Sequence, residues 1–179
     1  PEFSARIGEL SPTRRVPVLW HGERCIWDSL AICEYVNETF ADGRLWPADA
    51  GARAVGRSMA AEMHSGFPDL RNDMPMNFRA VNRRVEITPN TQADIERVFT
   101  LWSNSLARHS GAGPWLLGDF SIADAMFAPV VVRLGNYGVP VPGELQPYVQ
   151  THQDDQDIQL WAELAAAETW VVEADEAGV

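Results

Sequence analysis

Asp28 and Ser29 are the residues whose types and position best suit a site for a small charged molecule. They stand between a short β-type run and the first residue of a helical pattern. The unpaired amides of a helical first turn, with a hydroxyl beside them, can hold a carboxylate, and the carboxylate of Asp28 can accept from an ammonium group. One helix end would then bind both charges of an amino acid. Plain N-capping by Asp28 explains the same pair, and the local pattern alone favours this structural interpretation.

Pro17 lies inside the run Arg15-Val16-Pro17-Val18-Leu19, which otherwise has the composition of a buried strand. Proline has no amide hydrogen to donate to a sheet, so it belongs at a sheet edge, beside a bulge or in a cis peptide. A cis peptide would turn the backbone of Val16 outward, where its N–H and C=O could pair with an extended peptide ligand. The pattern alone favours an edge-strand proline.

Two further groups of residues have recognisable spacings. Arg57, His64 and Arg71 recur every seven residues, so on one continuous helix they would share a face that can receive an anionic substrate. A solvated surface or a subunit contact explains this face as well. Ser121 and Asp124 have the Ser-x-x-Asp form of a capping box before an apolar run. We assign that pair a structural role, the start of a core helix, and no catalytic role.

Several classes of chemistry are excluded or disfavoured. All 14 basic residues are Arg, so no lysine can act as a Schiff-base nucleophile or general base. There is no P-loop, GxGxxG turn, GxSxG elbow or HExxH helix. Cys25 and Cys33 lie eight residues apart and the four histidines are scattered, so we expect neither a CxxC redox pair nor a metal site. Two free thiols predict a reducing compartment, the cytoplasm.

Composition and charge describe a globular protein of one or two domains, with 46% apolar residues among 179. The net charge of −11 argues against nucleic acid and anionic membrane surfaces as partners. The longest apolar run, residues 125–132, is much shorter than the roughly 20 residues of a membrane span, so no transmembrane helix is expected. Residues 134–179 carry nine acidic residues and no Arg, which predicts a solvated acidic face.

The hydrophobic pattern predicts a mostly α fold with a small α/β part. Residues 16–20 and 24–27 are two β-type runs of a hairpin, and helical spacing follows from Ser29 to Phe40. Residues 41–51 are rich in Gly, Pro and Asp and form the predicted linker, which leaves domains at 1–40 and 52–179. Helical stripes then occur at 59–74, where Pro68 could kink the helix, and at 95–106, 121–134 and 157–172.

The order of motifs resembles the soluble glutathione S-transferases, and among them bacterial members related to the zeta class. The matching segments are SPTRRVPVL at 11–19, WDSLAICEY at 27–35, LWPAD at 45–49, EMHSGF at 62–67, MPMN at 74–77, FSIADA at 120–125 and AETW at 167–170. They cover nearly the whole chain and are specific in combination. The resemblance implies a thioredoxin-like N-terminal domain, an all-helical C-terminal domain and a homodimer.

The resemblance also implies glutathione as co-substrate. Pro17 would be a cis proline, and the backbone of Val16 would pair with the cysteinyl unit of glutathione. Ser29 and the helix amides would take the γ-glutamyl carboxylate, and Asp28 the ammonium group. Arg15 stands where relatives often have Lys, so a role at the glycyl end is a weaker expectation.

In the family, the first helix of the helical domain borders both the second-substrate pocket and the dimer contact. His64, Phe67 and Arg71 would line that pocket, and whether the Arg57 face meets substrate or subunit stays open. Asp124 would be a buried hydrogen-bonding acid.

The catalytic residue stays unassigned. In these transferases a Ser, Tyr or Cys in the first strand-to-helix turn lowers the pKa of the glutathione thiol, whereas Pro1-Glu2-Phe3 aligns with the second helix of the thioredoxin-like domain. We therefore expect a truncated thioredoxin-like domain that lacks a strand, a helix and a strand, roughly 40 to 50 residues.

Three functional hypotheses follow from the resemblance. In a glutathione transferase, the thiolate attacks an electrophilic carbon of a small substrate. In an isomerase of the maleylacetoacetate type, the thiolate adds reversibly and leaves after bond rotation, and a cationic helix face would suit the diacid. The third hypothesis is a non-catalytic binding module, favoured by the missing catalytic turn.

Overall fold

The computed structural model describes residues 2–178, with side chains from residue 6 onward. Its N-terminal part contains helix α1 (Glu2–Leu10), strands β1 (Val18–His21) and β2 (Arg24–Trp27), and helix α2 (Ser29–Phe40). The strands pair antiparallel, with Val18 opposite Trp27, and form a two-stranded sheet. Gly22 occupies the tight turn between them with φ 60°, a left-handed conformation that glycine adopts without steric cost. The predicted hairpin and following helix are confirmed.

The rest of the described chain is helical. Its elements are α3 (Ala50–Ser65), α4 (Pro68–Asp73), α5 (Pro89–Arg108), α6 (Ile122–Asn136), α7 (Gln146–Asp154), α8 (Gln156–Ala167) and the short 3-10 helices η1 (Gly143–Leu145) and η2 (Glu173–Asp175). No helix within residues 2–178 is both long and apolar enough to cross a lipid bilayer.

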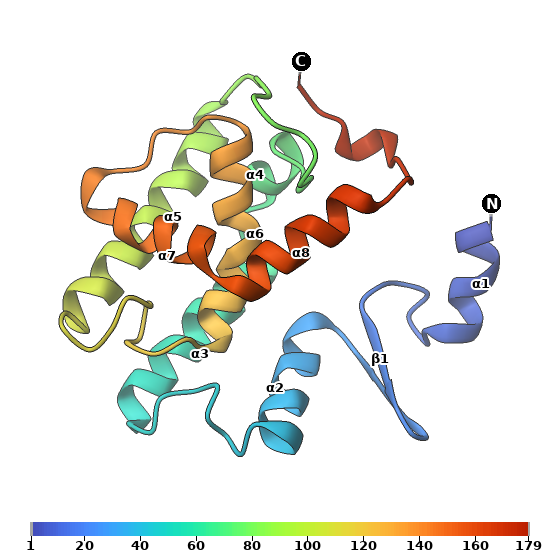
Figure 1. Ribbon diagram of the computed structural model, residues 1–179, viewed down its shortest axis with the longest axis horizontal. Coiled ribbons are helices and arrows are strands. Elements are labelled where there is room, and N and C mark those ends of the chain that lie inside the picture. Colours follow the sequence, from blue (N-terminus) through green and yellow to red (C-terminus); the bar gives the residue numbers. More distant parts are fainter. Residues whose placement is uncertain (1, 179) are drawn as a thin grey trace.

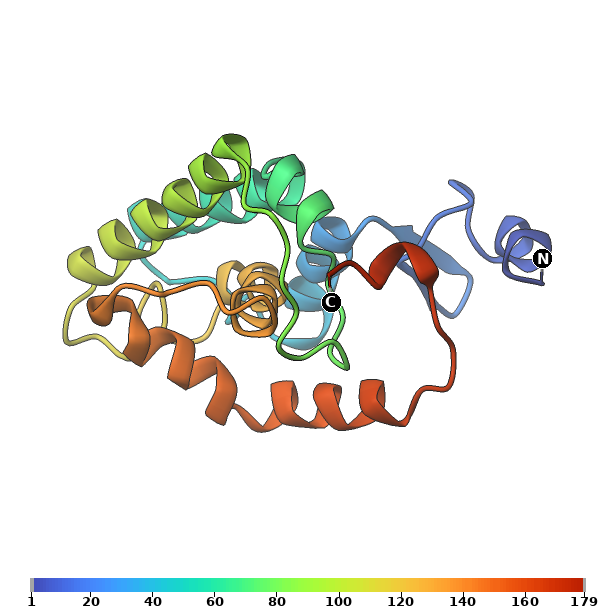
Figure 2. The same ribbon diagram turned by 90° about the horizontal axis from the view of Figure 1, so that it is seen from above.

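Helix α6 runs through the middle of the helical part. In Figure 2 it lies between α5, with α3 and α4, on one side and α7 with α8 on the other. The N-terminal hairpin and α1 extend away from this body, and α2 joins them to α3 (Figure 1). Helix α6 is mostly apolar around its circumference, as expected for a helix covered on both sides. The structure therefore has the mostly α architecture with a small α/β part that the sequence predicts.

The stripe at 59–74 belongs to two helices, not to one kinked helix. Helix α3 ends at Ser65, Gly66 is extended, and Phe67 has the left-handed φ of 57°. Pro68 then occupies the first turn of α4, where its missing amide hydrogen costs nothing. A Cβ at Gly66 would stand 2.6 Å from the carbonyl oxygen of Glu62, which explains why the break occurs at a glycine.

Two other helix predictions differ from the structure. The helix expected at 157–172 ends at Ala167, and Trp170 and its two successors lie exposed in an irregular segment. Helix α7 was not predicted, because its nine residues contain only a short apolar pattern, yet Tyr148, Val149 and His152 are buried in the core. In a helix this short, tertiary packing outweighs the local pattern.

Asp124 is the buried centre of the predicted capping box. Its Oδ2 accepts from the backbone N–H and the hydroxyl of Ser121, each at 2.9 Å. Its Oδ1 accepts from the N–H of Leu116 at 3.0 Å and from the hydroxyl of Tyr148 at 3.2 Å. Burial raises the pKa of Asp124, and the four hydrogen bonds oppose this shift because they favour the ionised form. The structure thus contains the capping box expected at Ser121 and Asp124, at the start of α6.

We expect Asp124→Ala to lower the free energy of unfolding by about 4 kcal/mol, because several buried donors lose their acceptor at once. Urea denaturation followed by circular dichroism measures the loss. Asp119→Ala is the matched control, since Asp119 is exposed close to the same turn, and should change stability by less than about 0.5 kcal/mol. Equal effects of the two substitutions would contradict a central role for the Asp124 carboxylate.

His152 is buried among aromatic rings at the end of α7. Its ring lies edge-on to Tyr148 at 4.8 Å and to Trp115 at 5.0 Å between centroids. Among the described residues neither ring nitrogen has a hydrogen-bond partner. Burial lowers the pKa of His152 to about 4, although the carboxylate of Asp155 acts in the opposite direction. The imidazole is therefore neutral in the folded protein near neutral pH.

A folded-state pKa below that of the unfolded chain makes stability fall in acid. As the pH drops from about 6.5 to about 4, the unfolded state binds a proton at His152 and the folded state does not. This site alone should remove about 3 kcal/mol of unfolding free energy across that interval. Urea denaturation of wild type and His152→Phe at about pH 7 and pH 4 tests the effect. The variant should lose less stability, and parallel losses would refute this assignment.

Candidate functional site

A groove of about 690 Å³ lies between the N-terminal part and the helical part. Its walls come from the loop before β1, the residues around the start of α2, the end of α3 and α4. The lining residues are Thr13, Arg15, Val16, Pro17, Trp27, Asp28, Ser29, His64 and Arg71. The structure thus brings together all five residues predicted to bind glutathione and two of the three predicted for a second substrate. What these residues bind stays a prediction at this point.

The peptide between Val16 and Pro17 is cis. This is the form that the family resemblance implies, and the edge-strand interpretation favoured by the local pattern is wrong in this respect. Val16 exposes 65% of its surface beside the groove. Pro17 directly precedes β1, so the groove begins where regular strand pairing starts.

Asp28 joins the two parts of the groove. Its Oδ1 accepts from the N–H groups of Leu30 at 3.0 Å and Ala31 at 3.4 Å, so it caps α2 as expected. Its Oδ2 lies 3.0 Å from Nε2 of His64 on α3. Asp28 also has a φ of 76°, a conformation that is costly for residues with a Cβ and that concentrates at functional sites. The side chain of Asp28 therefore both caps α2 and links the N-terminal part to the helical part through His64.

Ser29 follows at the first helical position of α2. Its side chain is half-buried at the groove, and within residues 6–178 its hydroxyl has no hydrogen-bond partner. The hydroxyl stands at the N-terminal end of a twelve-residue helix, whose dipole favours a carboxylate, and the next two amides already donate to Asp28.

The three residues spaced by seven do not share one helix face. His64 lies in the last turn of α3 and Arg71 in α4, and the Arg71 guanidinium donates to the His64 carbonyl oxygen at 3.2 Å. Arg57 lies apart from them, 3.3 Å from Oε1 of Glu34 and over the ring of Trp46. The prediction of one face is wrong because the helix ends before Arg71. His64 and Arg71 line the groove, whereas Arg57 does not.

Phe67 does not line the groove. Only 5% of its surface is exposed, and it packs in the helical core. The left-handed backbone at this position directs the chain from α3 into α4, which brings Arg71 back toward His64. Phe67 therefore shapes the groove through the backbone.

Thr13 and Trp27 line the groove but were not among the predicted site residues. Thr13 directly precedes the two arginines and Trp27 directly precedes Asp28. Their position next to predicted site residues was the only sequence feature that could have indicated them. The charges of the groove come from two arginines, one carboxylate and one histidine, an excess of positive charge that suits an anionic molecule. Within the described residues, no group of three metal-binding side chains is assembled.

Comparison with known proteins relates the chain to one family. Residues 1–39 match the family model described as glutathione S-transferase, N-terminal domain. Maleylacetoacetate isomerase from Rattus norvegicus is 32% identical over 150 residues, which are 82% of this chain and 64% of the rat protein. Glutathione S-transferase 1 from Dianthus caryophyllus is 32% identical over 74% of this chain and 58% of its own length. These matches support a soluble glutathione S-transferase family. Its relatives indicate a relation to the zeta class.

Solved structures show the same fold. A glutathione transferase homologue from Burkholderia GL BGR1, solved with bound glutathione, superimposes with a TM-score of 0.69 at 26% identity over 92% of this chain and 80% of its own. Maleyl pyruvate isomerase, a bacterial zeta-class transferase, gives a TM-score of 0.67 at 22% identity over 92% and 79% of the two chains. This family combines a thioredoxin-like domain with a helical domain. The 179 residues span less than two thirds of the curated relatives they match.

Proposed function

We propose that the groove binds glutathione and that the protein is a glutathione transferase, which adds the glutathione thiolate to a small electrophile. The observation that carries this proposal is the meeting of a cis Val16–Pro17 peptide with the Asp28-capped start of α2 in one groove. The match to the family model and the Burkholderia homologue with bound glutathione support it.

In the proposed complex, the hydroxyl and the N–H of Ser29 at the start of α2 hold the γ-glutamyl carboxylate. Asp28, whose Oδ1 accepts from Leu30 and Ala31, accepts from the ammonium group with Oδ2. The backbone of Val16 pairs with the cysteinyl unit, and Arg15 attracts the glycyl carboxylate. Residues 1–40 then form the glutathione-binding domain, 41–51 the linker and 52–179 the helical domain, except that α3 already begins at Ala50 within the predicted linker. Each carboxylate and the ammonium group of the tripeptide would then lie beside a group of opposite polarity in the groove. Such pairing offsets the cost of removing these charges from water.

The chemical step that we propose uses the sulfur of glutathione. The thiol gives its proton to solvent, and the thiolate forms a C–S bond with an electrophilic carbon. The electron pair of the bond that breaks at that carbon passes to a leaving group or, in an addition, to the adjacent acceptor atom. His64 and Arg71 stand on the helical wall, where they orient the second substrate. The residue that lowers the thiol pKa is not assigned to this sequence.

Glutathione binding to the 179-residue chain tests this proposal directly. Calorimetric titration should give a dissociation constant below about 1 mM, and Ser29→Ala should weaken it at least tenfold, or about 1.4 kcal/mol, because the carboxylate loses a charge-assisted hydrogen bond. Ser58→Ala is the matched control on the exposed side of α3 and should leave binding unchanged. A folded chain that binds no glutathione at about 10 mM would refute the assignment.

A glutathione-dependent isomerase of the maleylacetoacetate type is the second candidate. It is favoured by Arg71 beside His64 on the helical wall of the groove, which suits an anionic substrate, and by the isomerases among the relatives. In that reaction the thiolate adds to the double bond, the C–C bond rotates, and expulsion of the thiolate restores the alkene. We further propose that the protein works in the cytoplasm, as its two free cysteines suggest, and as a homodimer.

Steady-state kinetics of the diacid substrate separate the two candidates. If the protein is an isomerase, Arg71→Gln should raise KM for a maleyl diacid about tenfold with little change in glutathione affinity, because one carboxylate loses its partner. Arg84→Gln, an exposed arginine outside the groove, should leave KM unchanged. Conjugation of a neutral electrophile without isomerisation of the diacid would favour the general transferase. Glutathione binding without turnover of either would favour the binding module.

A further inference from the structure

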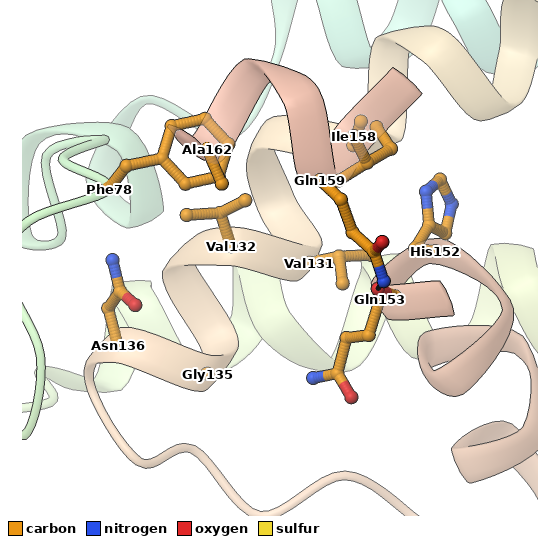
Figure 3. A pocket seen from close by; sticks show the side chains of 11 residues that line it. Phe78, Val131, Val132, Gly135, Asn136, His152, Gln153, Ile158, Gln159 and Ala162 are labelled. Atoms are coloured by element: carbon orange, nitrogen blue, oxygen red, sulfur yellow. Dashed lines mark hydrogen bonds between the residues drawn. The ribbon is translucent and has the colours of Figure 1, made fainter. Parts of the chain in front are cut away.

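A second cavity, of about 220 Å³, lies between α6 and α8 and shares no residue with the groove. Figure 3 shows Val131 and Val132 of α6 facing Ile158 and Ala162 of α8, with Phe78 at one end. The lining side chains are mostly apolar, and none of those described is an acid or an arginine. A charged ligand would be desolvated there without a partner, so this wall suits an uncharged, largely apolar molecule.

His152 provides the unused polar group of this cavity. It forms part of the wall, exposes 1% of its surface, and within the described residues its two ring nitrogens have no hydrogen-bond partner. A buried imidazole normally finds a partner, since leaving its polar atoms unpaired is costly. In its neutral form the ring offers one donor and one acceptor. A hydroxyl group can meet either nitrogen, because it both donates and accepts.

We propose that this cavity binds a small uncharged phenol, whose ring packs between α6 and α8 and whose hydroxyl hydrogen-bonds His152. A cavity of about 150 Å³ lined by apolar side chains holds a benzene ring, so 220 Å³ accommodates a ring with one or two small substituents. The low pKa of His152, about 4, agrees with the absence of charge from this ligand. The site is separate from the groove and does not depend on glutathione binding.

The ligand reaches His152 by moving α8 outward. Both ring nitrogens are buried while α8 lies in its present position. No residue of α8 is buried, and the helix is held at this cavity by the edge-on contact of Trp161 with Phe78 at 4.6 Å and by the bond from Gln159 to the Gln153 carbonyl. The extended residue Asp155 separates α7 from α8 and supplies the pivot. Arg79 also donates to the Glu168 carbonyl oxygen just beyond α8, so these contacts permit a limited outward displacement of the helix.

Two probes of nearly equal shape test the proposal on the 179-residue chain. NMR titration with 4-methylphenol should show saturable binding in the millimolar range or tighter. 1,4-Dimethylbenzene, which replaces the hydroxyl by a methyl group, should bind about tenfold more weakly. The ring nitrogen signals of His152 should shift with 4-methylphenol alone. In His152→Phe, the two probes should bind with equal affinity.

Substitutions in α8 test whether the probes bind in this cavity. Ala162→Trp fills the cavity and should abolish binding of both probes, whereas Leu160→Trp, on the exposed side of the same helix, should retain it. Saturating glutathione should leave the affinity for 4-methylphenol unchanged. The proposal is overturned if the folded wild type binds neither probe, if both bind equally well, if Ala162→Trp still binds, or if glutathione displaces the phenol.

Discussion

The buried carboxylate of Asp124 is the interaction on which the arrangement of the helices depends. It holds the turn at Leu116, the start of α6 and the hydroxyl of Tyr148 on α7 to one point. The adjacent N–H of Ile122 donates to the carbonyl oxygen of Leu45, which ties the segment after α2 to the same helix end. Because α6 contacts α3 along its length, this point fixes α2 and α3 relative to each other. Asp124 therefore helps to set the shape of the groove, although it does not line the groove itself.

The break between α3 and α4 turns that arrangement into a binding surface. One continuous helix would carry Arg71 two turns beyond His64 along the same axis. The extended Gly66 and left-handed Phe67 instead fold the chain back, so the Arg71 guanidinium reaches the His64 carbonyl. His64 in turn contacts Asp28 across the groove. A locally unfavourable backbone therefore brings side chains from three elements to one place, as is common at functional sites.

The sequence predicted those features that depend on neighbouring residues. The hairpin, the Asp28 cap and the Ser121 capping box each follow from side chains within a few positions of one another. The grouping of Asp28 with His64 depends on a contact between distant segments, which local patterns do not encode. The cis state of Pro17 was implied only by the family resemblance, because the local pattern favoured an edge-strand proline. Periodicity also failed at Gly66, because a buried apolar stripe continues across the break and looks the same on either side of it.

Charge patterning described only part of the C-terminal segment. Most acidic residues after position 133 are exposed, as predicted for a solvated face, but part of this segment folds back on an arginine-rich loop. Arg79 donates to the carbonyl oxygens of Glu168 and Trp170 at 2.7 and 2.6 Å, and Arg83 pairs with the Glu176 carboxylate at 2.5 Å. Most of these hydrogen bonds are thus accepted by backbone carbonyl groups of this segment. Counting charged side chains does not detect such acceptors. Because the segment is anchored just beyond α8, the anchor limits how far that helix can swing from the cavity beneath it.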